Sequence, residues 1–403
     1  MPVLLQINVT SNWGSTGKIA EQIGHLAQER GWKSYIMYGR YANTSSSQTI
    51  RIGSIVDYGL HYLFARLLDK QGLFSARATR KALKEIERIK PDIIHLHNIH
   101  GYYLNYPILF KFLSKKRIPV IWTLHDCWPF TGHCAFFEKI ECAKWRQGCH
   151  SCELTREYPK SWFVDNSIQN YSLKNRFFNK IPSENMLLVP VSEWLSSLVG
   201  NSFLRGFKRS VIHNGVDTDT FMPQKNGMRE KLNLNEKDFV VLGVSSVWDV
   251  RKGMLDFMAL SKRSEVKVVL VGVSEKEERQ LPSNIIAVRR TQNQKELSMI
   301  YSMADVYVNP TYDDNFPTTN IEALACGTPV ITYRTGGSPE AVDSETGIVV
   351  NKGDINGLAE AINEIKQKGK AFYSDACRRR AMNCFKSPDC YMDYLRLYNE
   401  LIK

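Results

Sequence analysis

Two carboxylates and the short helix between them form the part of the sequence with the clearest chemistry. Asp314 and Glu322 lie eight positions apart around a helix that we predict over Thr319–Ala325. Pro317 stands where the first helical residue should be, and Gly327 stands just past the helix end. The start of such a helix presents backbone N–H groups and a positive dipole end to an anion. The two acids could hold the hydroxyl groups of one extended ligand at two points, although an N-terminal acid and an ordinary helical glutamate would give the same pattern.

A pair of adjacent cations, Arg251 and Lys252, follows a predicted strand at Phe239–Val244. They should therefore lie at the carboxyl edge of a sheet, ahead of a helix at Leu255–Lys262. Two such cations suit a diphosphate, because the arginine side chain can bind phosphate oxygens in bidentate fashion. A solvated basic turn is the alternative interpretation.

A glycine-containing turn joins the first predicted strand, Val3–Val9, to the first predicted helix, which runs from about Gly17 to Arg30. Gly14 and Gly17 form a Gly-x-x-Gly pattern followed by Lys18, and such turns let backbone amides approach an anion closely. The pattern is neither a phosphate-binding P-loop nor a complete dinucleotide fingerprint, so alone it indicates little.

Histidines cluster at two further predicted strand ends. His125 follows the strand Val120–Leu124, where it could hydrogen-bond a ligand hydroxyl, and Asp126 could fix its tautomer. A structural histidine is the alternative. Another polar and aromatic cluster could line a ligand pocket, which in a transferase would hold the acceptor, or could be purely structural: His95, His97, His100, Tyr102 and Tyr103.

Four cysteines, Cys134, Cys142, Cys149 and Cys152, lie close together within an insert of about residues 127–160. Four thiolates that include one Cys-x-x-Cys pair suit a tetrahedral structural zinc ion, which would leave no open position for catalysis. Reduced thiols without metal, a redox pair and an iron–sulfur cluster also stay open. Substitute ligands are available at His133, His150 and Cys127.

Alternating apolar strands and amphipathic helices predict two parallel sheets covered by helices on both faces. The pattern runs once through residues 1–212 and restarts in residues 213–386, near an Asn-Gly turn signal at Asn214-Gly215. Residues 387–403 contain an amphipathic segment, Tyr391–Ile402, that should pack back on the first domain. We therefore expect an α/β chain of two doubly wound, Rossmann-like domains with a ligand cleft where their carboxyl edges face each other.

At this point a family resemblance becomes specific. The stretch 313–330, together with Gly336-Gly337-Ser338-Pro339-Glu340, resembles the donor-binding signature of retaining GT-B-fold glycosyltransferases of family four, also described as glycosyl transferases group 1. The resemblance implies that Glu322 hydrogen-bonds the nucleotide ribose. It also implies that Asp314, where the family usually has Glu, contacts the donor-sugar hydroxyls.

The same resemblance extends to the other motifs. It implies that Arg251 and Lys252 neutralise charge on the departing nucleotide, and that His125 acts near the reacting centre. Gly14 and Gly17 would border the acceptor and the diphosphate, and Asn320 lies within the donor motif.

What the resemblance implies for function is the transfer of a sugar from a nucleotide-sugar donor to a carbohydrate acceptor, in capsule, O-antigen or exopolysaccharide assembly. The acceptor could be lipid-linked, and the chemistry would need no metal or other cofactor. Two rival functions stay open: a nucleotide-sugar epimerase on the same fold, and a non-catalytic glycan- or lipid-binding module.

Composition bears on partners and location. The formal net charge is +12, which favours anionic partners, but no nucleic-acid-binding motif is evident. Neither an apolar run of 18 residues nor a signal peptide is evident, so we expect a cytoplasmic protein. Basic residues on the helices predicted at Val56–Lys70 and Arg77–Ile89 could contact an anionic inner membrane leaflet or could simply be solvated.

Overall fold

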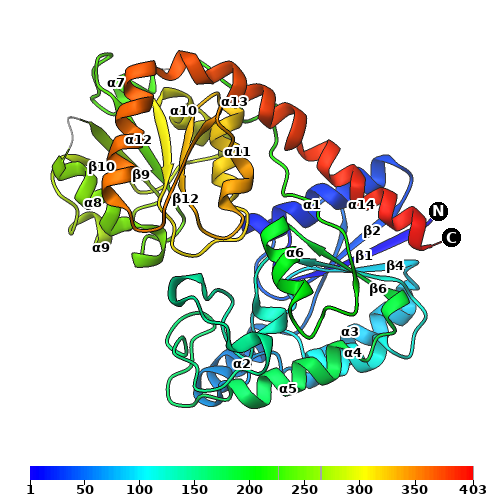
Figure 1. Ribbon diagram of the computed structural model, residues 1–403. Coiled ribbons are helices and arrows are strands. Elements are labelled where there is room, and N and C mark those ends of the chain that lie inside the picture. The colour runs from blue at the N-terminus through cyan, green and yellow to red at the C-terminus, as the bar shows by residue number, and fades with distance from the viewer. Residues whose placement is uncertain (226, 264–265, 403) are drawn as a thin grey trace. The chain divides into compact units, whose positions relative to one another are not determined.

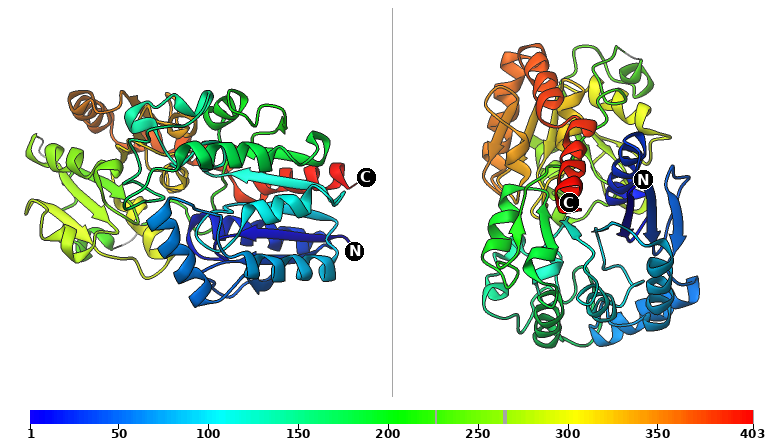
Figure 2. Two further views of the ribbon diagram at one scale, coloured as in Figure 1. Left: turned by 90° about the horizontal axis from the view of Figure 1, so that it is seen from below. Right: turned by 90° about the vertical axis from the view of Figure 1, so that its right-hand side faces the viewer.

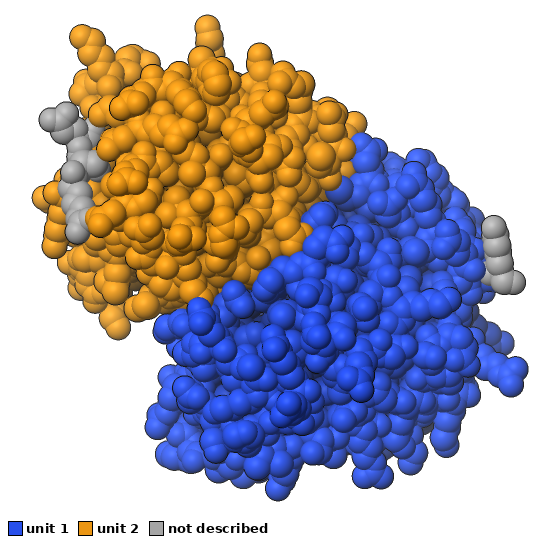
Figure 3. Space-filling model, in the orientation of Figure 1, with its two compact units in different colours: residues 1–213, 388–403 blue, residues 214–387 orange. Residues whose placement is uncertain are grey.

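The computed structural model describes residues 1–225, 227–263 and 266–402, which form two compact units (Figure 3). Unit 1 comprises Met1–His213 and Pro388–Lys403, and unit 2 comprises Asn214–Ser387. In each unit a parallel sheet lies between layers of helices (Figure 1). The prediction of two doubly wound α/β domains is confirmed.

Unit 1 is built on a seven-stranded sheet in the order β3-β2-β1-β4-β5-β6-β7, with every pair parallel. Its strands are β1 (Val3–Asn8), β2 (Lys33–Tyr38), β3 (Gln48–Arg51), β4 (Ile93–Leu96), β5 (Val120–Leu124), β6 (Met186–Pro190) and β7 (Lys208–Arg209). Its helices are α1 (Gly14–Glu29), α2 (Ile55–Leu68), α3 (Ala76–Ile89), α4 (Tyr106–Leu113), α5 (Ser167–Phe178) and α6 (Glu193–Gly200). Strands β4 and β5 are buried along their whole length, as expected for central parallel strands.

The C-terminal helix α14 (Ser387–Leu401) belongs largely to unit 1. Its Tyr391, Tyr394 and Tyr398 share one buried cluster with Leu4 and Ile19. Figures 1 and 2 show α14, in red, beside α1, in blue. The first unit's core is therefore completed by the last helix of the chain.

Unit 2 contains a six-stranded parallel sheet in the order β10-β9-β8-β11-β12-β13. Its strands are β8 (Val240–Val244), β9 (Lys267–Val271), β10 (Ile285–Val288), β11 (Val306–Asn309), β12 (Val330–Tyr333) and β13 (Gly347–Val350). Its helices are α7 (Met228–Lys231), α8 (Met254–Arg263), α9 (Glu275–Glu278), α10 (Gln294–Met303), α11 (Thr318–Ala325), α12 (Ile355–Lys368) and α13 (Lys370–Cys384).

Two predicted helix starts differ from the structure. Helix α1 begins at Gly14 rather than near Gly17, because its first turn is exposed and the apolar stripe used for the prediction starts only at Ile19. Helix α11 begins at Thr318, so Pro317 is the residue that precedes the helix and not its first residue. Among the described helices, none combines the length and the apolar character needed to cross a bilayer.

Candidate functional site

The topological switch point of unit 2 lies between β8 and β11, the neighbouring strands from which the chain winds in opposite directions. In open α/β sheets, ligands bind beyond the carboxyl ends of the strands at such a point. The segment after β8 carries Arg251 and Lys252, and the segment after β11 carries Asp314. Strand order thus brings together residues that are separated by about sixty positions in the sequence.

A one-turn 3-10 helix, η5 (Val250–Lys252), positions the two cations. The side chain of Asp249 caps it by accepting a hydrogen bond from the backbone N–H of Lys252 at 3.0 Å. Gly253 ends the turn with φ of +73°, and a Cβ there would lie 2.3 Å from the carbonyl oxygen of Pro310. Only glycine fits this close contact between the segments that follow β8 and β11.

The cations and the acid bind each other directly. The ammonium group of Lys252 forms an ion pair with the carboxylate of Asp314. The guanidinium of Arg251 donates to the carbonyl oxygen of Asp313 at 3.1 Å. The second oxygen of Asp314 accepts from the backbone N–H of Asn315 at 2.9 Å. The three predicted residues therefore form one charged group at the switch point.

Asn320 and Glu322 lie on α11, at different depths. Asn320 is fully buried, where its amide accepts from Asn309 at 2.8 Å and donates to the carbonyl oxygen of Ser338 at 3.2 Å. It therefore holds two segments of the site together and does not line the surface. Glu322 is half-buried and accepts from the hydroxyl of Tyr301 at 3.0 Å. Burial, reinforced by the negative charge of Glu322, raises the pKa of Tyr301 well above its ordinary value, so this hydroxyl remains a donor.

The loop after β12 contributes two hydroxyl groups that sequence reasoning missed. The side chains of Thr335 and Ser338 are buried, and neither hydroxyl has a hydrogen-bond partner among the described residues. Gly336 lies between them with φ of +55°, and a Cβ there would lie 1.9 Å from the carbonyl oxygen of Asp314. The loop thus packs directly on the charged group, and its Gly336-Gly337-Ser338 sequence is part of the stretch on which the family resemblance rests, although no role was assigned there to the two hydroxyls.

Unit 1 has a corresponding switch point between β1 and β4. Gly14, exposed and with φ of +66°, opens α1 beyond β1. Gly17 is buried, and a Cβ there would lie 2.6 Å from the Thr10 hydroxyl, so this glycine is needed for packing rather than for ligand approach. Lys18 is exposed on the same helix.

His125, which follows β5, lies beside His97, which follows β4. The two rings approach with 3.2 Å between Nε2 of His125 and Nδ1 of His97, whose other nitrogen lies 3.0 Å from Oε1 of Gln6. Burial lowers the pKa of His125 to about 4 and holds that of His97 well below its ordinary value. Both rings are therefore neutral near pH 7 and can exchange hydrogen bonds with hydroxyl groups.

The carboxylate of Asp126 makes a different contact from the predicted one. It lies 3.0 Å from Nε2 of His100 and accepts from the backbone N–H of Trp128 at 2.9 Å. Burial alone would raise the pKa of Asp126, but the charge of His100 and the hydrogen bond to it outweigh burial and lower that pKa. Asp126 therefore orients His100, and we withdraw the expectation that it fixes the tautomer of His125. Of the other predicted acceptor residues, His95 is buried against Tyr398 and Thr123.

The surface of α2 differs from the basic face predicted for it. Its exposed side chains are mainly apolar: Ile55, Val56, Leu60, Leu63, Phe64 and Leu68. The exposed basic residues lie on α3 instead: Arg77, Arg80, Lys81, Lys84 and Arg88. Two consecutive helices thus carry an apolar surface and a basic surface.

The four clustered cysteines, Cys134, Cys142, Cys149 and Cys152, carry no disulfide. In residues 1–225, 227–263 and 266–402, no group of three or more His, Cys, Asp or Glu side chains is arranged in the geometry of a metal site.

Comparison with known proteins identifies the family. The model of Glycosyltransferase Family 4 matches residues 18–220, half of the chain, and the model described as Glycosyl transferases group 1 matches residues 238–368. The chain belongs to glycosyltransferase family 4. The protein is therefore a glycosyltransferase, as its sequence predicts.

Among the relatives of this glycosyltransferase is the putative colanic acid biosynthesis glycosyl transferase WcaC of Escherichia coli, 24% identical, with 92% of this chain and 96% of that protein covered. A D-inositol 3-phosphate glycosyltransferase of Mycobacterium sp. (strain KMS) is 31% identical over 40% of either chain.

Solved structures share the fold. Sucrose-phosphate synthase from Thermosynechococcus elongatus matches with a TM-score of 0.77 at 20% identity, covering 100% of this chain and 99% of that one. WaaG, a glycosyltransferase involved in lipopolysaccharide biosynthesis, matches with a TM-score of 0.65 at 14% identity, covering 97% and 99%. The glycosyltransferase thus has two parallel-sheet α/β units of the GT-B kind.

Proposed function

We propose that this glycosyltransferase moves a sugar from a nucleoside-diphosphate sugar to a carbohydrate acceptor, with retention of anomeric configuration, in the assembly of a cell-surface polysaccharide. The observation that carries the proposal is the meeting of Arg251, Lys252 and Asp314 at the switch point of unit 2, with Glu322 on the adjacent helix. The similarity to the WcaC protein, which is named for colanic acid biosynthesis, supports the polysaccharide setting.

Each residue has a role that follows from its chemistry. Lys252 and Arg251 would bind the diphosphate and offset the charge that develops as the bond from the sugar C1 to the phosphate oxygen breaks. A bond from the acceptor oxygen to C1 forms on the same face, and the acceptor proton leaves with the nucleoside diphosphate. Asp314 would then exchange part of its contact with Lys252 for the sugar hydroxyls, and Glu322 would accept a hydrogen bond from the ribose.

The unpartnered hydroxyls of Thr335 and Ser338 fit the same donor. Both are buried in the loop that packs on Asp314, and a buried hydroxyl without a partner costs stability. Phosphate oxygens or ribose hydroxyls would give these groups partners. His125, neutral beside His97, is a suitable contact for a hydroxyl of the donor sugar or the acceptor.

A screen of UDP-, GDP- and ADP-sugars tests the proposal. We expect saturable binding of one nucleotide class by calorimetry, slow release of the nucleoside diphosphate, and an at least tenfold weaker affinity in Glu322→Gln. NMR of the product anomeric proton tests retention, and an inverted configuration would exclude it. Conversion of the donor to an isomeric nucleotide sugar without acceptor would instead identify an epimerase, and binding of glycans or lipids without any nucleotide binding would identify a binding module.

We further propose that the enzyme works at the cytoplasmic face of the inner membrane on a lipid-linked acceptor. The apolar surface of α2 next to the basic surface of α3 supports this, because such a combination favours anionic lipid surfaces. Phe64 on α2 and Phe372 on α13 of unit 2 are both exposed, at 41% and 66%. We expect Phe64→Ser to reduce flotation with phosphatidylglycerol vesicles severalfold and Phe372→Ser to leave it unchanged. Flotation of both variants to the same extent as the wild type would contradict the proposal.

A further inference from the structure

The cysteine-rich insert of unit 1 has little regular structure of its own. Its secondary structure consists of three 3-10 turns: η1 (Trp128–Phe130), η2 (Glu138–Ile140) and η3 (Lys144–Arg146). It nevertheless buries large aromatic side chains, with the ring of Trp145 centred 5.2 Å from that of Phe130 and 5.5 Å from that of Phe137. A segment with so few repeating backbone hydrogen bonds needs another source of order.

All four cysteines line one small cavity. Cys134, Cys142, Cys149 and Cys152 surround a space of about 20 Å³, which is room for roughly one water-sized sphere. The thiols of Cys134 and Cys152 are hydrogen-bonded to each other. The four cysteines, which lie in the loops between and after these turns, thus line one small space, although no three such side chains among the described residues already stand in the geometry of a metal site.

Backbone donors point at these sulfur atoms. The N–H of Gly132 lies 3.1 Å from Sγ of Cys149, and the backbone of Leu154 donates to Cys152. A Cβ on Gly132 would lie 2.6 Å from Cβ of Cys149, so glycine permits this close approach. Amide donors favour the thiolate form of sulfur over the thiol, because they stabilise its negative charge.

Two buried nitrogen groups stand beside the cavity. The amine of Lys174, only 1% exposed, donates to the carbonyl oxygens of Trp128 and Thr131 at 2.7 and 3.0 Å, and the side chain of Cys149 is the neighbour that most favours its charged form. Burial lowers the pKa of Lys174 to about 7, so a negative charge at Cys149 would stabilise its ammonium form.

His133 is the second of these groups and also lines the cavity. Its Nδ1 lies 2.5 Å from Oδ1 of Asp69, while its buried Nε2 has no hydrogen-bond partner among the described residues. Metal-ligating histidines are oriented by a carboxylate in the same way, so His133 is the alternative ligand that the cobalt spectra described below test.

We propose that Cys134, Cys142, Cys149 and Cys152 bind one structural Zn²⁺ ion. Zinc prefers four thiolates in a tetrahedron, and a site closed by four protein ligands serves structure and not catalysis. Binding by four thiols releases four protons, and the resulting group carries two negative charges, one of which the ammonium of Lys174 offsets. The insert, built of short turns, closes its four sulfur atoms around the ion. The proposal is independent of the donor and acceptor assigned above.

Metal analysis of the full-length protein tests the proposal. We expect about one zinc per chain by mass spectrometry of the purified protein, released by a thiol-specific mercurial and detected with a metallochromic dye. Cys142→Ser and Cys152→Ser should retain less than about one-fifth of that zinc. Cys384→Ser, which changes an exposed cysteine of α13 in unit 2, should retain all of it.

Cobalt substitution provides a readout that does not depend on the folding of a variant. Co²⁺ in the wild type should show the intense visible bands of a tetrahedral tetrathiolate, and His133→Gln should keep this spectrum. A spectrum typical of three sulfurs and one nitrogen that changes in His133→Gln would overturn the proposed ligand set. Absence of zinc together with disulfides mapped at these cysteines, or bound iron with broad visible absorption, would overturn the zinc proposal itself.

Discussion

Replacing Lys252 with alanine should weaken nucleoside-diphosphate binding more than the loss of one contact explains, because the replacement also leaves Asp314 unpaired beside the phosphates. The two side chains are 21% and 17% exposed, so their interaction is only partly screened by solvent. A charge-assisted hydrogen bond contributes about 1.5–3 kcal/mol. An unpaired carboxylate ~8 Å from a phosphate charge adds ~2 kcal/mol of repulsion at an effective dielectric constant of ~20.

The combined loss of about 3.5–5 kcal/mol corresponds to a weakening of between roughly 300-fold and 4,000-fold at low ionic strength. The double variant Lys252→Ala with Asp314→Asn removes the repulsion but not the lost contact. It should therefore bind roughly 5- to 30-fold more tightly than the single variant, since salt reduces part of the repulsion.

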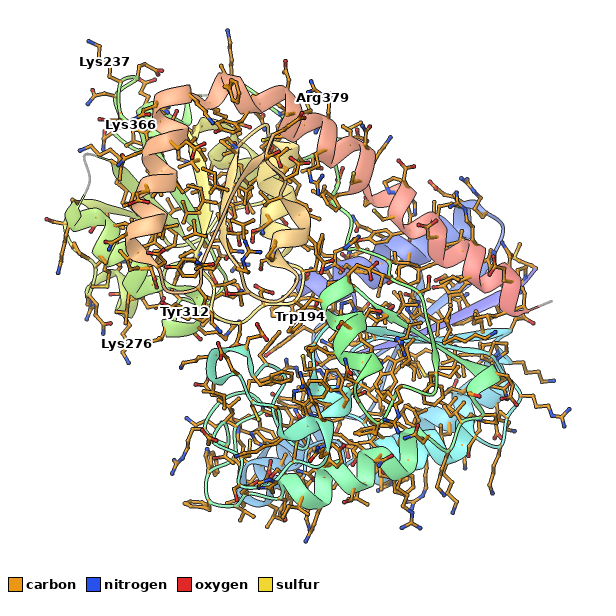
Figure 4. All side chains as sticks on the ribbon, viewed as in Figure 1. Trp194, Lys237, Lys276, Tyr312, Lys366 and Arg379 are labelled. Atoms are coloured by element: carbon orange, nitrogen blue, oxygen red, sulfur yellow. The ribbon has the colours of Figure 1, made fainter. Side chains whose placement is uncertain are left out.

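Isothermal titration with whichever of UDP, GDP and ADP binds the wild type best provides the measurement. Lys237→Ala is the matched control, because Lys237 precedes β8 whereas Lys252 follows it, at opposite edges of the sheet. Figure 4 shows Lys237 on the far side of unit 2 from Tyr312, which lies close to Asp314 in the sequence. If Lys252→Ala binds within threefold of the wild type, or if the double variant binds no better than the single one, the phosphates do not lie at this ion pair.

Three further predictions concern stability. Gly336→Ala should lower the free energy of unfolding by at least about 1–3 kcal/mol in urea titrations and abolish nucleotide binding, because the added Cβ would lie 1.9 Å from the carbonyl oxygen of Asp314. The control Gly227→Ala, whose Cβ would meet open space, should change both quantities little. Burial lowers the pKa of His125 to about 4. The free energy of unfolding should therefore fall as the pH drops from ~6.5 toward 4, and this histidine should contribute at most about 1.4 kcal/mol per pH unit to that fall. His125→Gln should remove this contribution. An unchanged slope of the free energy of unfolding against pH in the variant would refute the prediction. Burial raises the pKa of Asp256, so the stability gained by its protonation is present below pH ~3.8 and is lost as pH rises through the folded-state value. Asp256→Asn should accordingly raise the free energy of unfolding at pH 7 but not at pH 3, and an equal change at both would contradict the sign.

The sheets could be predicted because most of their strands are continuous apolar runs. The predicted bounds of β5, Val120–Leu124, match the structure. The edge strand β3 escaped prediction, since Gln48–Arg51 is mostly polar and exposed and has no apolar run to reveal it. The spacing of apolar residues in the sequence indicates which side chains are buried. An edge strand is held mainly by backbone hydrogen bonds, and these do not depend on the type of side chain.

The candidate site was predictable residue by residue but not in its contacts. Short motifs located Arg251, Lys252 and Asp314, yet the ion pair depends on β8 lying next to β11, which the sequence order does not dictate. For the same reason Asp126 was expected to orient His125, its neighbour in the sequence, whereas the fold places His100 against the Asp126 carboxylate. Contacts between distant segments follow from strand order, and local patterns do not encode it.

The position of α14 has a consequence for how the protein is made. Unit 2 is a continuous stretch of chain, so it can fold as soon as it leaves the ribosome. Unit 1 cannot complete its core until Tyr394 and Tyr398, which meet Thr123 and His95, have been synthesised. For most of translation the apolar surface of the first unit that α14 later covers therefore stays exposed, although domains synthesised first usually fold first. A released chain that ends shortly before Tyr391 would carry a finished second unit and an unfinished first one, which makes the N-terminal unit the one most in need of a chaperone.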